Sequence, residues 1–126
     1  MKHCPFCYIE KNEYIEESEL SFAKFDQYPV SYGHALIISK RHASNYFDLS
    51  EEEQIDMMAL VARVKKQLDK KTGSLHYNIG INCGQDAGQT IDHVHIHIIP
   101  RFKGDVEDPR GGVRWIIPDK ANYWDE

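Results

Sequence analysis

The stretch from His93 to Ile99, His-Val-His-Ile-His-Ile-Ile, constrains the fold of this chain more than any other. Strict alternation of this kind predicts a β-strand, because successive side chains of a strand point to opposite faces of a sheet. The three histidines then share one face, at intervals of about 6.6 Å along the chain. Because proline cannot donate to the hydrogen-bond ladder, Pro100 is expected to close the strand.

Three imidazoles on one face of a strand can line a catalytic cleft, hold a metal ion, or occur together by chance. Chance is a poor explanation, because a strand that merely faces solvent more usually carries Thr, Lys or Glu. A catalytic cleft and a metal site both stay open on this motif alone.

A helix is predicted over residues 50–72. Ser50 and Glu53 have the spacing of a capping box, and lysines near the other end complement the helix dipole. Gly73 suits the position that follows the last turn. One apolar stripe, which marks the face that packs on the sheet, consists of Met57, Leu60, Val61, Val64 and Leu68.

Three further segments are predicted as strands, namely 20–26, 34–39 and 76–82. The second of them is apolar enough to be central in a sheet. His34 begins that strand, and a single histidine there is more typical of a hydrogen-bonded core residue than of a catalytic one.

The donor-rich loop Gly84–Thr90 leads directly into the histidine motif. Glycines let backbone N–H groups approach an anion closely, and the Gln89 amide and the Thr90 hydroxyl add donors. Most Gly-rich loops are only turns, but the position of this one beside the histidines favours an anion-binding role.

The N-terminal pair Cys4 and Cys7 has the Cys-Pro-Phe-Cys spacing. Such a pair can grip one zinc ion, but a tetrahedral structural site needs two more ligands. A thioredoxin-like redox motif needs a preceding strand, and the chain before Cys4 is too short for one. Two small buried residues are the remaining interpretation.

The C-terminal region 102–126 contains Asp-Pro-Arg-Gly-Gly-Val-Arg-Trp, in which proline and two glycines exclude a regular helix. Arg110 and Arg114 could clamp phosphates, and Trp115 could stack on a base. Equally, this tail could pack across its own domain or across a dimer partner.

Length and charge restrict the function classes. A chain of 126 residues is expected to form one domain, over residues 1–126. It has no apolar run of about 20 residues and no signal-peptide pattern, so we expect a cytoplasmic protein without a membrane partner. The net charge of −5 argues against nucleic acid as a partner.

With these features assembled, the chain resembles the histidine triad (HIT) family, whose motif is His-φ-His-φ-His-φ-φ with φ apolar. His93 to Ile99 fits at every position, and the resemblance spans roughly residues 4–105. The Gln-Thr pair before the triad and Arg101 after it favour the fragile-histidine-triad branch, whose members cleave dinucleoside polyphosphates. The Asp-Pro-Arg-Gly-Gly-Val-Arg tail is similar to tails of microbial diadenosine tetraphosphate hydrolases.

The resemblance implies an α+β, HIT-like fold with an antiparallel sheet of about five strands and the helix 50–72 on one face. Residues 1–19 would be an N-terminal segment anchored by zinc, and residues 102–126 an irregular tail. Family members are typically homodimers whose sheets join across a two-fold axis.

The resemblance also implies roles for individual residues. His95 matches the nucleophile, which would attack an α-phosphate and form a covalent nucleotidyl-histidine that water hydrolyses. The catalytic group comprises His95, His97 and His34. The residues that would bind the nucleotide substrate are Asp26, Asn82, Gly88, Gln89, Thr90, Phe25 and Ile37.

In a metal-binding subset of the family, the first triad histidine ligates zinc together with an N-terminal Cys-x-x-Cys. The matching ligands here are Cys4, Cys7, His42 and His93, with His3 as a possible replacement. Such a Cys₂His₂ set, one ion per chain, has no open position and would therefore be structural.

Two alternatives to dinucleoside polyphosphate hydrolysis stay open. One is an adenosine phosphoramidate hydrolase, which cuts a P–N bond at the same site. The other is a zinc-stabilised nucleotide sensor whose hydrolysis is incidental, so that it would keep its effect without the nucleophile.

Overall fold

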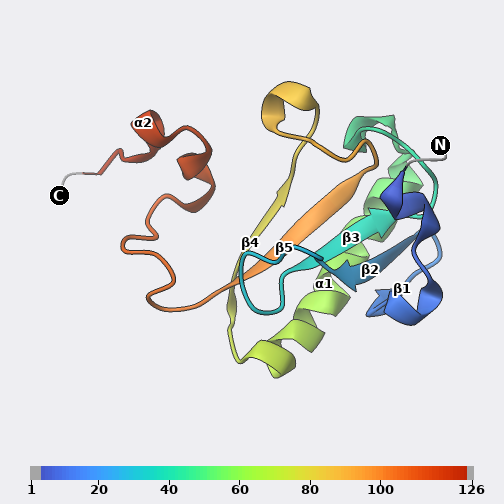
Figure 1. Cartoon of the computed structure of the whole chain (residues 1–126), viewed down its shortest axis with the longest axis horizontal. Coiled ribbons are helices and arrows are strands. Elements are labelled where there is room, and N and C mark those ends of the chain that lie inside the picture. The colour runs from blue at the N-terminus through green and yellow to red at the C-terminus, as the bar shows by residue number, and fades with distance from the viewer. Residues whose placement is uncertain (1–3, 125–126) are drawn as a thin grey trace.

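The computed structural model describes residues 4–124, which form one antiparallel sheet with a long helix on one face (Figure 1). The strand order is β1-β2-β3-β5-β4. The strands are β1 (Glu16–Glu17), β2 (Ser21–Phe25), β3 (Ala35–Ser39), β4 (His76–Ile81) and β5 (His95–Arg101). The α-helices are α1 (Glu51–Thr72) and α2 (Pro118–Ala121). The predicted α+β class and the five-stranded sheet are confirmed.

Helix α1 begins and ends where the sequence predicts. The Ser50 hydroxyl accepts from the Glu53 N–H at 3.1 Å, and the Ser50 N–H donates to the Glu53 carboxylate at 2.8 Å, so the capping box is complete. Gly73 ends the helix in the left-handed region with φ of 79°. The whole apolar stripe of α1 is buried against the sheet.

The histidine strand differs from its prediction at both ends. His93 and Val94 precede β5, because the His93 N–H turns back to the Ile91 carbonyl. At the other end Pro100 lies inside the strand and pairs with Tyr77 of β4. The Pro100 carbonyl accepts from Ser31, on the side away from β4. Because the N–H and C=O of a strand residue point to the same side, the N–H that Pro100 lacks would also have pointed away from β4. Its absence therefore removes no hydrogen bond to β4.

The register divides the sheet into two faces. Leu36 pairs with His97 and Ile38 with His95, so these four side chains share the face opposite α1. On that face a smaller apolar cluster comprises Phe22, Leu36 and Ile38, with Phe6, Ile9 and Tyr14 packed against it. The main core on the α1 side includes Ala23, Ala35, Ile37, Ile96 and Ile98.

The connecting segments contain short 3₁₀ turns, including η1 (Pro5–Tyr8), η2 (Lys11–Glu13), η3 (Tyr46–Asp48) and η4 (Gln85–Ala87). The tail forms a small unit of its own, which contains η5 (Gly112–Ile116) and α2 and lies beyond β4 (Figure 1). Within residues 4–124, none of the helices combines the length and apolar character that membrane crossing requires.

Candidate active site and metal centre

His95 is fixed by a main-chain acceptor. Its Nδ1 lies 2.8 Å from the His93 carbonyl oxygen, which can only accept, so Nδ1 carries the proton and Nε2 keeps its lone pair. The side chain is buried, with its ring against Phe6 at 5.0 Å and His97 at 5.1 Å between centroids. A neutral imidazole with a free Nε2 lone pair is a competent nucleophile.

A second hydrogen-bonded chain fixes His34 and His97. The Val30 N–H donates to His34 Nδ1 at 3.1 Å, so the proton of the neutral ring sits on Nε2. The His34 Nε2 atom lies 3.0 Å from His97 Nδ1, to which it donates, and 3.3 Å from the Asp26 carboxylate. His97 Nδ1 therefore accepts, and the Nε2–H of His97 is left to donate to a ligand.

Both of these rings stay neutral at pH 7. Burial lowers the pKa of His34, against the opposing charge of Asp26. Burial, together with the neighbouring rings of His95 and His34, lowers the pKa of His97 to about 4. The site thus presents uncharged imidazoles to an anionic substrate, each with a defined tautomer.

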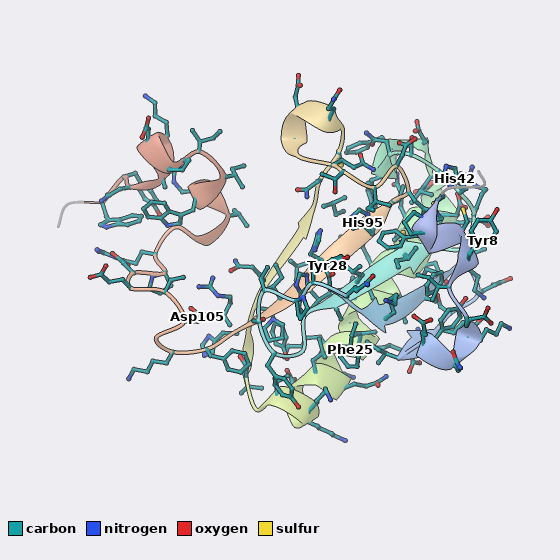
Figure 2. All side chains as sticks on the ribbon, in the orientation of Figure 1. Tyr8, Phe25, Tyr28, His42, His95 and Asp105 are labelled. Atoms are coloured by element: carbon teal, nitrogen blue, oxygen red, sulfur yellow. The ribbon has the colours of Figure 1, made fainter. Side chains whose placement is uncertain are left out.

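A cavity of about 360 Å³ opens beside these histidines. His34, His97 and Asn82 line it, as does Val113 from the tail. The structure therefore brings Asn82 together with two of the predicted catalytic residues. Figure 2 places His95 at the end of the sheet close to the N-terminal segment, with His42 farther out on the same side.

The loop Gly84–Thr90 is held in place by the side chain of Gln89. The Gln89 amide group donates to the carbonyls of Ser44 and Ile91, at 2.6 and 3.0 Å, and its oxygen accepts from the Gly84 N–H at 2.8 Å. The Gln89 amide therefore holds the loop together, and its contact with the scissile phosphate or the leaving group stays a prediction. Gln89 and the exposed Thr90 line a separate hollow of about 310 Å³.

Within that loop the exposed Gly88 ends η4 with φ of 92°, a left-handed conformation that glycine adopts without strain. The structure thus gives Gly88 a turn-forming role. A contact of Gly88 or Thr90 with phosphate stays a prediction.

Two residues expected in the base pocket point the other way. Ile37 is fully buried in the core beneath α1. Phe25 lies under the Lys71 ammonium group at the end of α1, 5.2 Å from ring centroid to nitrogen. Both predictions are therefore wrong, because these side chains lie on the face opposite the histidines. Leu36 and Phe6 are apolar residues on the histidine face that were not among the residues predicted for the base pocket.

The predicted metal ligands lie together. The donor atoms of Cys4, Cys7, His42 and His93 all lie within 4.8 Å of one another. Individual S–N distances are 3.3 Å from Cys4 to His93 Nδ1, 3.2 Å from Cys7 to His42 Nδ1, and 3.6 Å from Cys7 to His93 Nδ1. Tetrahedral zinc would place sulfur and nitrogen ligands roughly 3.5 Å apart, given its usual bond lengths. The cluster can hold a metal ion.

A hydrogen bond prepares His93 for that role. Its Nε2 lies 2.8 Å from the Ser39 carbonyl, so Nε2 carries the proton and Nδ1 turns a lone pair toward the sulfurs. His93 is fully buried, and its own carbonyl is the group that orients His95. The alternative ligand His3 lies outside the described residues.

Comparison with known proteins agrees with this geometry. The model of the HIT domain matches residues 10–104. The chain belongs to the HIT family. It is 42% identical over 102 residues to adenosine 5'-monophosphoramidase hnt1 of Schizosaccharomyces pombe, covering 78% of this chain and 74% of that protein.

Two further similar proteins are named as a triphosphatase and as a diadenosine triphosphate hydrolase. The chain is 38% identical over 100 residues to bis(5'-adenosyl)-triphosphatase of Dictyostelium discoideum, covering 79% of this chain and 67% of that protein. The diadenosine triphosphate hydrolase of Plasmodium falciparum has a solved structure that superposes with a TM-score of 0.74 at 30% identity, covering 90% of this chain and 82% of that one.

Proposed function

We propose that this HIT protein is a nucleotide hydrolase that cleaves dinucleoside polyphosphates at an α-phosphate through a covalent nucleotidyl-His95. The observation that carries the proposal is the bond from His95 Nδ1–H to the His93 carbonyl at 2.8 Å, which leaves Nε2 as the nucleophilic atom. It is supported by relatives named as a triphosphatase and a diadenosine triphosphate hydrolase.

The proposed reaction has two steps. In the first, the Nε2 lone pair of His95 attacks the α-phosphorus, an N–P bond forms, and the P–O bond to the leaving group breaks with its electron pair on oxygen. In the second, water attacks the same phosphorus, its proton passes to solvent, and the N–P bond electrons return to Nε2. The Nε2–H of His97 is placed to stabilise charge on the phosphoryl oxygens.

The first nucleoside is proposed to lie against the apolar cluster on the histidine face, where Leu36 and Phe6 are available. Asp26 was predicted to bind the ribose hydroxyls, and this contact stays a proposal. Its carboxylate already accepts from the Tyr28 N–H at 2.9 Å and lies near His34, so one oxygen at most is free to turn toward a ribose.

Intact-protein mass spectrometry after rapid, acid-free quenching with diadenosine tetraphosphate tests the proposal. We expect a nucleotidyl adduct on the wild type and none on His95→Ala. His76→Ala is the matched control, because His76 is exposed on β4 and makes no side-chain bond among the described residues. An adduct on His95→Ala, or turnover by that variant at the wild-type rate, would refute His95 as the nucleophile.

A second candidate function is hydrolysis of adenosine phosphoramidates, and the 42% identity to a monophosphoramidase favours it specifically. Both substrates use the same nucleophile, so the adduct experiment does not separate them. The ratio of kcat/KM for diadenosine tetraphosphate to that for adenosine 5'-phosphoramidate does, and we expect it to exceed one. A nucleotide sensor would instead keep its cellular effect in His95→Ala.

We propose in addition that Cys4, Cys7, His42 and His93 hold one structural zinc ion per chain. The donor set and its S–N distances support this assignment. Four protein ligands leave no open coordination position, so the ion would fix the N-terminal segment to the sheet.

A homodimer is also proposed, formed by joining two sheets. β4 is an edge strand in the described part of the chain, and its Ile79 is 42% exposed. An open edge with an exposed apolar side chain suits pairing with a second copy. Sedimentation velocity tests it, with a monomer as the contrary outcome.

A further inference from the structure

A second and larger cavity lies between the tail and the ends of β4 and β5. Asp105, which is labelled in Figure 2 on the segment that leads from β5 to the tail, is one of its lining residues. Its volume is about 660 Å³, within the range of roughly 300 to 1,000 Å³ of small-molecule sites. It shares Val30, Asn78, Ile99 and Gly112 with the cavity beside His34 and His97. The two cavities therefore lie next to each other and share part of their lining.

The charge of this cavity argues against a phosphate as its occupant. Asp105, Glu107 and Asp108 line it. Asp105 neutralises Arg101 through two bonds of 2.8 Å, and Asp108 neutralises Arg110. Glu107 has no ion-pair partner among residues 4–124, so the lining is acidic overall. A base that carries an amino group suits such a lining, and an anion does not.

The same cavity offers an aromatic surface. Trp115 and Trp124 both line it, and Trp115 is 43% exposed. The Trp115 indole N–H donates to the Arg110 carbonyl at 2.7 Å, which fixes the ring before any ligand arrives. Trp124 is covered on one side by the Arg110 guanidinium, 4.5 Å from its centroid. Trp115 is therefore the better stacking platform for a base.

We propose that this tail cavity binds the second nucleoside of a dinucleoside polyphosphate, with its base stacked on Trp115 and its amino group toward Glu107. The inference rests on the proposed function and extends it. The reacting phosphate lies at the histidines, the remaining phosphates run past Asn78, and the distal nucleoside lies under the tail. A phosphoramidate with a small leaving group would leave this cavity empty.

The chain has two tryptophans, and both line this cavity, so fluorescence excited selectively at tryptophan reports on it. The experiment uses the full-length His95→Ala chain, which removes the nucleophile, and titrates it with diadenosine tetraphosphate or with AMP. Equilibrium dialysis with labelled ligand measures binding independently. We expect the dinucleotide to change the fluorescence and AMP, which fills only the first nucleoside site, to leave it unchanged.

Substitution of Trp115 sharpens the test. In the same background, Trp115→Ala should raise the Kd of the dinucleotide about tenfold and leave the Kd of AMP unchanged, because one stacking contact is lost. Phe47→Ala is the matched control, since Phe47 is 74% exposed on η3 and does not line the cavity. It should change neither Kd.

The outcomes separate the two proposals. Dinucleotide binding with an unaltered Kd in Trp115→Ala and no fluorescence change would overturn the tail site and leave the proposed function standing. Equal fluorescence changes with AMP and dinucleotide would also overturn it, because the cavity would then take the first nucleoside. Binding of AMP without any binding of the dinucleotide would refute the proposed substrate class and the tail site together.

Discussion

The imidazole of His97 lies between His34 and His95, and its surroundings allow it little charge. Burial and these neighbours lower its pKa to about 4, from an ordinary value of 6.5. In the unfolded chain the ring takes up its proton at the higher pH. Between pH 6.5 and pH 4 the unfolded state therefore binds more protons than the folded state, and stability falls as the pH falls.

We expect His97→Asn to reduce this pH dependence. Asparagine can still accept from the His34 Nε2–H but does not titrate. The free energy of unfolding of the wild type should lose about 1 to 2 kcal/mol more than that of the variant between pH 7 and pH 4.5, a figure reduced from the full shift because the ring is partly solvated. Urea unfolding at several pH values measures this, and parallel curves would contradict the assignment.

The histidines of the site could be predicted from the sequence motif and from the family resemblance, but the apolar residues beside them were not predicted. The spacing of the three histidines predicts their common face, and the resemblance adds His34 and His42. Phe25 and Ile37 failed because a strand alternates faces, so a choice one residue out of phase selects the opposite side. Leu36 is two residues after His34 on the same strand, so its side chain lies on the histidine face, and this spacing would have pointed to Leu36 as a residue of the base pocket.

Among the elements, the first turn of α1 is linked to the end of β3 by an ion pair. The Arg41 guanidinium donates to both oxygens of Glu53, at 2.9 and 2.8 Å, just after β3 ends. The Arg41 hydrogen bond is the main cause that lowers the pKa of Glu53 to about 2. Glu53 is also the second member of the capping box with Ser50, so one carboxylate holds both the start of α1 and the residue after β3.

Glu53→Gln should destabilise the chain by about 1 to 2 kcal/mol at pH 7, since a bidentate pair between a buried carboxylate and an exposed guanidinium is lost while the cap is partly kept. The contribution of a carboxylate with a lowered pKa is present above about pH 4.5 and disappears as the pH falls toward 2. A double-mutant cycle with Arg41→Gln measures the coupling. Additive effects of the two substitutions would show that the pair contributes nothing.

Elements with strong local signals were predictable, and those set by distant contacts were not. The capping box and Gly73 fix both ends of α1. β1 has only Glu16 and Glu17, too few residues for a periodic pattern. β5 can continue past Pro100 because β3 no longer pairs with it there, while β4 still does. This depends on the neighbouring strands and cannot be predicted from the residues around Pro100.

The contacts of the two tail arginines could not be predicted from the sequence either. Arg110 pairs with Asp108 and Trp124, and Arg114 donates to the Ala121 carbonyl at 2.9 Å. Both arginines thus hold the tail in its own fold, and the interpretation in which they clamp phosphates loses its support. The partners of these arginines are set by the path of the tail and cannot be predicted from its composition.

At the scale of the whole molecule, the proposed zinc site joins three distant parts of the chain. We expect about one zinc per chain in the wild type and in Cys83→Ser, and a loss of zinc in Cys7→Ser, by elemental mass spectrometry. Cys83 is the matched control because it is a free cysteine outside the cluster. A chelator should lower the Tm of the first two proteins and have little effect on Cys7→Ser.

Zinc content that is the same in all three proteins would exclude Cys7 as a ligand. Loss of zinc from Cys83→Ser as well would point to a different donor set. An unchanged Tm in the presence of chelator, with one zinc per chain removed, would show that the ion contributes nothing to stability.

The wide separation of these ligands has a consequence for how folding responds to the surroundings. Cys7 and His42 are 35 residues apart, and Cys4 and His93 are 89 apart, so the four donors meet only once the sheet has formed. A ligand that binds the native chain and not the unfolded one stabilises it by mass action, by about 1.4 kcal/mol for each tenfold rise in its free concentration above Kd. With zinc bound as proposed, the population of folded enzyme would follow the free zinc of its compartment, and metal supply would set how much active protein the same amount of chain provides.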